Sequence, residues 1–126
     1  MTKKTLLVLY YTRGIYPLRN TIKTHLYCWK RSSKHNVVYV NVAFGFPERL
    51  IRKLDIDTVI FHTIFLGMRW TPSVFRRRIE ECSYLRTLNC VKIAMPQDEF
   101  LNTDLLNDFI VDFGVTHVLS CAYAED

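Results

Sequence analysis

The sequence predicts a Rossmann-like α/β fold: a doubly wound, parallel, five-stranded sheet with helices on both faces, in three α/β/α layers. Five apolar runs of strand length alternate with segments of helical spacing, and short connections between such elements imply right-handed crossovers. Several of these runs are apolar almost throughout, which is typical of parallel strands covered on both faces. With 126 residues, 49% of them hydrophobic, and four Gly and four Pro, residues 1–126 are expected to form a single domain.

The predicted strands are rich in Val, Ile, Leu and Tyr, the residue types that favour a pleated, buried backbone. They span Thr5 to Tyr11, Asn36 to Val42, Thr58 to Phe61, Val91 to Met95 and His117 to Cys121.

Four helices are predicted between the strands. Proline favours the first helical position, so the first two helices are expected to open at Pro17 and Pro47. The third has Thr71 as its N-cap and Pro72 in its first turn, and the fourth runs from near Asn102 or Thr103 to Gly114. Helical spacing predicts these inward-facing residues, helix by helix: Leu18, Ile22, Leu26 and Trp29; Leu50, Ile51 and Leu54; Phe75, Ile79, Cys82 and Leu85 or Leu88; Leu105, Leu106, Phe109, Ile110 and Phe113.

The charge distribution is uneven. All 17 Lys and Arg lie in residues 1–92 against five acids, whereas residues 93–126 hold seven acids and no Lys or Arg. A basic face can bind an anionic surface, although charges that solvate exposed helix faces are the commoner explanation. Arg76, Arg77 and Arg78 lack the interleaved aromatics that stack bases, so nucleic acid is not expected as a partner.

No apolar run approaches the roughly 18 residues that span a bilayer, and no secretory signal is evident, so a cytoplasmic chain is expected. The four cysteines, Cys28, Cys82, Cys90 and Cys121, form no C-x-x-C pair. We therefore expect reduced core thiols, with neither a zinc site nor a disulfide framework.

A ligand site is expected beyond the carboxyl ends of the strands, where the strand order reverses. The loop after the first strand, Thr12 to Tyr16, belongs to this point in both common orders. With the order 3-2-1-4-5 its neighbour is the loop after the fourth strand, Pro96 to Phe100. With the order 2-1-3-4-5 its neighbour is the loop that begins at His62 and Thr63.

Gln97, Asp98 and Glu99 are an amide and two acids at a strand exit, which suits binding of hydroxyl-rich ligands or general-base chemistry. The acids could equally cap the following turn or pair with Arg13 or Arg69.

His62 is a candidate base or orienting group, although a lone histidine is more often simply packed. Arg13 and Gly14 could approach a phosphate, but no complete glycine-rich phosphate motif is present.

Three common doubly wound functions fit poorly. A receiver domain needs an acidic pair after its first strand, where this chain has Tyr11 and Thr12. A dinucleotide-binding fold needs a glycine-rich loop and an acid that binds ribose, and this chain has neither. A flavodoxin needs a hydroxyl-rich loop, and Thr12 to Tyr16 offers a single Thr.

The run from Val91 to Phe100 (VKIAMPQDEF), followed by an apolar helix and Phe113 to Ser120 (FGVTHVLS), resembles the N-terminal domain of bacterial two-domain glycosyltransferases of the GT-B type. Leu54 to His62 is similar to the third strand of the same domain.

This resemblance implies the acceptor-binding half of an enzyme of cell-surface polysaccharide biosynthesis, inactive alone, with a nucleotide sugar as the donor of the full-length protein. Thr12, Arg13, Gly14 and Gln97 would bind substrate, and His62, Asp98 and Glu99 would be catalytic.

The same resemblance implies a missing C-terminal nucleotide-sugar domain as partner, and no metal or other cofactor in this domain. The basic residues could hold the protein at an anionic inner membrane face. The alternative function is a stand-alone flavodoxin-like module that binds a small ligand or a protein without catalysis.

Overall fold

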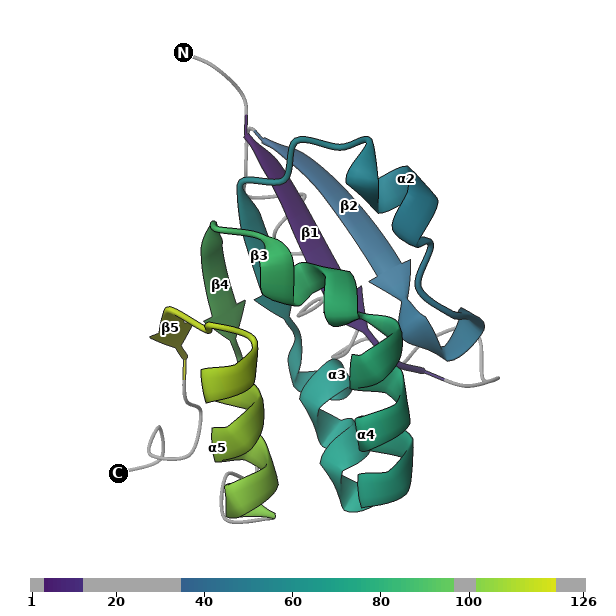
Figure 1. Ribbon diagram of the computed structural model, residues 1–126, viewed down its shortest axis with the longest axis vertical. Helices are drawn as coiled ribbons and strands as arrows, with labels where there is room; N and C mark the ends of the chain where they lie inside the picture. Colours follow the sequence, from purple (N-terminus) through teal and green to yellow (C-terminus); the bar gives the residue numbers. More distant parts are fainter. Residues whose placement is uncertain (1–3, 13–34, 97–101, 120–126) are drawn as a thin grey trace, which may run out of the picture.

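The computed structural model describes residues 4–12, 35–96 and 102–119 and consists of a parallel sheet with helices packed against it (Figure 1). The strands are β1 (Thr5–Tyr10), β2 (Asn36–Asn41), β3 (Thr58–Phe61), β4 (Val91–Ala94) and β5 (His117–Val118). The helices are α2 (Glu48–Arg52), α3 (Thr63–Leu66), α4 (Pro72–Glu81) and α5 (Thr103–Asp112). Short 3₁₀ turns cover Val42–Phe44, Gly67–Trp70 and Ser83–Thr87. The helix predicted from Pro17 lies outside the described residues.

The five strands form one parallel sheet in the order β2-β1-β3-β4-β5. The predicted parallel α/β fold is thus confirmed. Of the two strand orders that the sequence leaves open, the structure has 2-1-3-4-5. β1 is an internal strand: Val8 pairs with Tyr39 of β2 on one side and with Ile60 of β3 on the other. Each predicted strand is present within a residue or two, apart from the last, of which His117–Val118 is described as strand.

The sheet is buried on both faces at its centre. Leu7, Leu9, Val59 and Phe61 belong to the larger cluster and are completely buried. The phenylalanine rings of α3, α4 and α5 pack there, with the rings of Phe61 and Phe109 4.8 Å apart edge to face. The opposite face holds a smaller cluster of Val8, Tyr10, Ile60 and Met95. The core therefore lies mainly between the sheet and helices α3 to α5, which Figure 1 shows in front of it.

The prediction for the inward face of α2 is partly wrong. Ile51 is buried, but Leu50 is 63% exposed and Leu54 is 38% exposed. α2 has five residues, a little more than one turn, so it directs one side chain into the core instead of a stripe of three. Leu50 and Leu54 therefore remain at the surface.

In α4, Phe75 and Ile79 face the core as predicted, and Cys82 and Leu85 follow them there. Thr71 occupies the N-cap position, but its side chain makes no capping hydrogen bond. α5 begins at Thr103 and is followed by Gly114 at φ +67°, as its predicted ends require.

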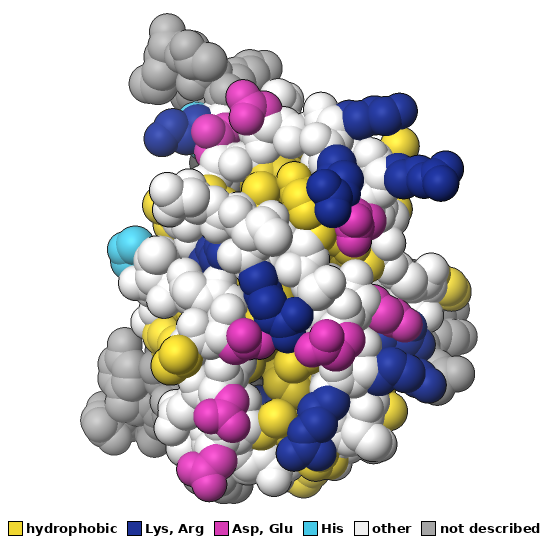
Figure 2. All heavy atoms as spheres, viewed as in Figure 1, with side chains coloured by type: hydrophobic (Ala, Val, Ile, Leu, Met, Phe, Trp, Pro, Cys, Tyr) yellow, Lys and Arg dark blue, Asp and Glu magenta, His cyan; other side chains and the backbone are white. Residues whose placement is uncertain are grey.

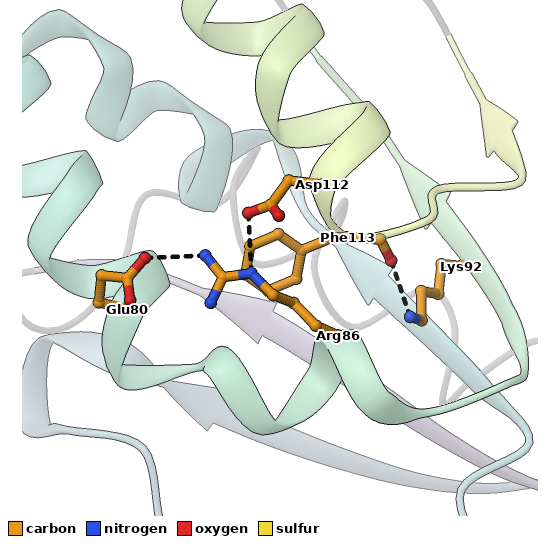
Figure 3. A network of polar contacts seen from close by, with 5 residues as sticks. All are labelled: Glu80, Arg86, Lys92, Asp112 and Phe113. Atoms are coloured by element: carbon orange, nitrogen blue, oxygen red, sulfur yellow. Dashed lines mark hydrogen bonds and ion pairs between the residues drawn. The ribbon is translucent and has the colours of Figure 1, made fainter.

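A polar network holds the end of α5 against the sheet (Figure 3). Lys92 of β4 is 2% exposed, and its Nζ donates to the Phe113 carbonyl at 2.7 Å. Arg86 forms ion pairs at 2.8 Å with Glu80 of α4 and Asp112 of α5, and its guanidinium lies 4.6 Å from the centre of the Phe113 ring. The last turn of α5 is thereby tied to α4 and to β4.

Surface charges on the helical face differ between the helices. Figure 2 shows basic side chains mixed with acidic ones over α2 and α4, and acidic side chains over α5. Within the arginine run of α4, Arg78 pairs with Glu81 three residues on, while Arg76 and Arg77 are exposed. Such exposed i,i+3 pairs contribute only a few tenths of a kcal/mol.

Lys92 should make stability depend on alkaline pH. Burial lowers its pKa below 10.5, so between the lowered pKa and 10.5 the unfolded chain binds more protons than the folded chain. The free energy of unfolding of the wild type should therefore rise relative to that of Lys92→Met as the pH increases through this window. Urea unfolding of both proteins between neutral pH and pH 10 measures the difference. Substitution of the exposed Lys53 by Met is the control, and a difference independent of pH would contradict the assignment.

Candidate functional site

The strand order fixes which loops meet at the carboxyl edge of the sheet. The order reverses at β1, whose neighbours are β2 and β3, so the chain leaves β1 beside the exit of β3. The amide of His62 donates to the Leu9 carbonyl at 3.0 Å and continues the β1–β3 pairing at this edge. Thr12 and His62 therefore belong to neighbouring loops, as the order 2-1-3-4-5 requires.

Asn41, the last residue of β2, holds the exit of β1. Its Oδ1 accepts hydrogen bonds from the Thr12 amide at 3.1 Å and from the Ala43 amide at 3.1 Å. Its Nδ2 donates to the Thr12 carbonyl at 3.0 Å. The side-chain amide thus pairs with Thr12 as a peptide group of a neighbouring strand would, and extends the β1–β2 pairing by one step.

His62 is buried, with 1% of its surface exposed, and it caps α3. Its Nδ1 accepts a hydrogen bond from the Ile64 amide at 3.2 Å, so the neutral ring carries its proton on Nε2. This geometry makes the ring a hydrogen-bond donor through Nε2. A ring that donates through Nε2 fits a packed or orienting histidine better than a general base, which must accept a proton.

The segment predicted to carry the acidic group begins and ends next to anchored residues. The Thr63 hydroxyl donates to the Met95 carbonyl at 2.8 Å, two residues before Gln97. Beyond the segment, Asn102 Nδ2 donates to the carbonyl of the buried Arg69 at 2.6 Å. Gln97, Asp98 and Glu99 themselves lie outside the described residues, as do Arg13 and Gly14, so their predicted roles stay predictions.

An open pocket of about 440 Å³ adjoins this edge at the end of β2. It is lined by residues 39–41 of β2 and residues 44–47 of the loop that follows. Asn41 therefore lines the pocket and also bonds to Thr12.

The part of the chain that the structure describes contains no group of three His, Cys, Asp or Glu placed to hold a metal ion. None of its helices has the length and apolar character needed to cross a bilayer. Cys82 and Cys90 are free thiols, and burial raises the pKa of Cys82 to about 12. That thiol is fully protonated at neutral pH and is a core residue, not a nucleophile.

Two residues of this edge were not assigned a role from the sequence. In the sequence, Asn41 is recognisable only as part of the second predicted strand, and Thr63 only as a residue of the loop after the third. Both contacts join exits of neighbouring strands, so they require the strand order. A short polar side chain at or just after the end of an apolar run is the sequence signal that could have indicated both contacts.

Comparisons of the chain with protein-family models, with curated proteins and with solved structures find no match.

Replacing Asn41 by Ala should destabilise the fold by about 1–3 kcal/mol, because Thr12 and Ala43 lose their side-chain partner at a partly buried position. Urea unfolding measures the change. Asn89→Ala, at an exposed position, is the matched control. Equal stability of the two variants would show that Asn41 does not hold the β1 exit.

Proposed function

We propose that this chain is the acceptor-binding domain of a glycosyltransferase that moves a sugar from a nucleotide sugar to a glycan or lipid-linked acceptor. On this proposal the domain is inactive alone, and a second, C-terminal domain binds the donor. The reaction takes place in the cytoplasm, where nucleotide sugars are the donor substrates.

One observation carries the proposal. The three segments that resemble the GT-B N-terminal domain, residues 54–62, 91–100 and 113–120, supply β3, β4 and β5. These strands are neighbours in the sheet and parallel, so their exits meet at one edge. The polar residues that follow β3 and β4 in those segments are therefore suited to act on one ligand.

The chemistry assigned to this edge is base-assisted transfer. A carboxylate, Asp98 or Glu99, takes the proton of the acceptor hydroxyl while its oxygen bonds to the anomeric carbon. The bond from that carbon to the nucleoside diphosphate breaks, and the diphosphate leaves with the electron pair. Nε2 of His62 donates a hydrogen bond that orients the site, and Thr12, Arg13, Gly14 and Gln97 bind the acceptor.

Asp98→Asn in the full-length natural protein should lower the rate of transfer by about 10²- to 10⁴-fold, the usual contribution of a general base. Radiolabelled sugar transfer measures the rate. Asp108→Asn makes the same charge change at an exposed position of α5 and should leave the rate unchanged. An unchanged rate in Asp98→Asn would refute the assignment of Asp98, and the same result in Glu99→Gln would refute the base role of the pair.

The proposal includes peripheral contact with an anionic membrane face. Residues 1–34 contain eight of the 17 Lys and Arg and no acid, while Arg52, Arg78 and Arg86 of the described surface are already in ion pairs. We expect the chain to float with vesicles containing phosphatidylglycerol at low salt and to be released at high salt, because such attraction is screened. Flotation that persists at high salt, or none at low salt, would contradict this part.

The strand order favours a second candidate, a flavodoxin-like binding module, because 2-1-3-4-5 is the order of flavodoxin. A flavin-binding chain would be yellow as purified, whereas the acceptor domain of a glycosyltransferase would be colourless.

A further inference from the structure

We propose that the pocket at the end of β2 is a subsite for an uncharged sugar ring, and, resting on the proposed function, that this ring belongs to the acceptor. None of the residues that line the pocket is a site residue predicted from the sequence. Asn41 connects the two, because it lines the pocket and bonds to Thr12, a predicted substrate-binding residue.

The shape of the pocket comes from a turn that leaves aromatic surface open to solvent. β2 is an edge strand among the described strands, so the outer side of its backbone has no partner strand. Gly45, at φ +100°, reverses the chain there, and Phe44 is left 77% exposed. Phe46 packs partly against the core on the other side of the turn. The volume of about 440 Å³ lies within the range of small-molecule sites.

The chemistry of the lining selects the class of ligand. The described residues of the lining, 39–41 and 44–47, include no Asp, Glu, Lys, Arg or His, so none of them offsets the desolvation of a charged ligand. Phe44 and Phe46 are aromatic lining residues, and the faces of such rings have a negative electrostatic potential that attracts the weakly positive C–H groups of a sugar. The outer edge of β2, which has no partner among the described strands, supplies backbone amide groups suited to hydroxyls. Ring faces beside neutral amides fit a sugar better than a phosphate or a carboxylate.

The position of the pocket links this subsite to the proposed reaction. Asn41 lines the pocket and is bonded through both side-chain polar atoms to the backbone of Thr12. A ring seated against Phe44 would therefore lie beside the β1 exit, on the acceptor side of the proposed site. We expect this subsite to affect acceptor binding and not the chemical step.

The direct test is binding of simple glycosides to the 126-residue chain. The probes are methyl α-D-glucopyranoside, methyl α-D-galactopyranoside and methyl α-D-mannopyranoside, with uridine as a planar ring without phosphate. We expect at least one glycoside to shift the Gly45 amide resonance saturably at millimolar concentration, the weak affinity of a small polar ligand. Absence of saturable shifts with all three glycosides, or binding of uridine alone, would overturn the proposal.

The variant Phe44→Ala tests whether the glycosides bind at the pocket that Phe44 lines. Because Phe44 is 77% exposed, the variant should fold normally, and it should weaken glycoside binding about tenfold, as loss of a stacking partner predicts. Leu50→Ala removes another exposed apolar side chain, 63% exposed, from nearby α2, outside the pocket lining, and should leave binding within about twofold of the wild type. Equal affinity of Phe44→Ala and the wild type would overturn the proposal.

The two proposals fail separately. In the full-length protein, Phe44→Ala should raise the KM for the acceptor without lowering kcat. Glycoside binding that depends on Phe44, in a full-length protein with no transfer activity, would leave the subsite standing and refute the transferase. Transfer with an acceptor KM that Phe44→Ala does not change would support the transferase and refute the subsite.

Discussion

Burial of the two central strands on both faces is the constraint on which the rest of the structure depends. β1 and β3 alternate between the two clusters, so that Leu7 and Val59 face α3 to α5 while Val8 and Ile60 face the opposite side, all without exposure. A shift of one residue in either strand would exchange the two sets of side chains, so the register is strongly specified. That register places the ends of β1 and β3 side by side and thereby creates the edge at which the candidate site lies.

At this edge the pairing of strands is continued by side chains. Asn41 bonds to the backbone of Thr12, Thr63 bonds to the carbonyl of Met95, and His62 caps the helix that follows its own strand. Each contact fixes the point at which a loop leaves the sheet. Loops that carry binding or catalytic residues generally depend on such a rigid scaffold, because the scaffold limits the positions that a loop can reach. The neutral pocket beside Asn41 would extend the same edge outward, over the end of β2.

Much of the fold could be predicted from local pattern. The apolar runs predicted β1 and β3 because a strand buried on both faces needs an apolar side chain at nearly every position. The strand order could not be predicted, since the same alternation of elements satisfies both common orders, and the role of Asn41 depends on that order. Leu50 and Leu54 were misassigned because helical spacing gives direction but not helix length. For Asp98 and Glu99, only the residue type predicts a general-base role. Whether they pair with Arg13 or Arg69 instead depends on tertiary contacts, which the spacing of residues does not determine.

The central claim is that this chain forms the acceptor half of a two-domain enzyme. The most direct test is the size of the native polypeptide in its source cells, measured by capture with an antibody against the domain and mass spectrometry of the captured band. The account predicts a polypeptide longer by one further domain, about 150–200 residues. A native polypeptide of only 126 residues would contradict the claim and would favour a small binding module.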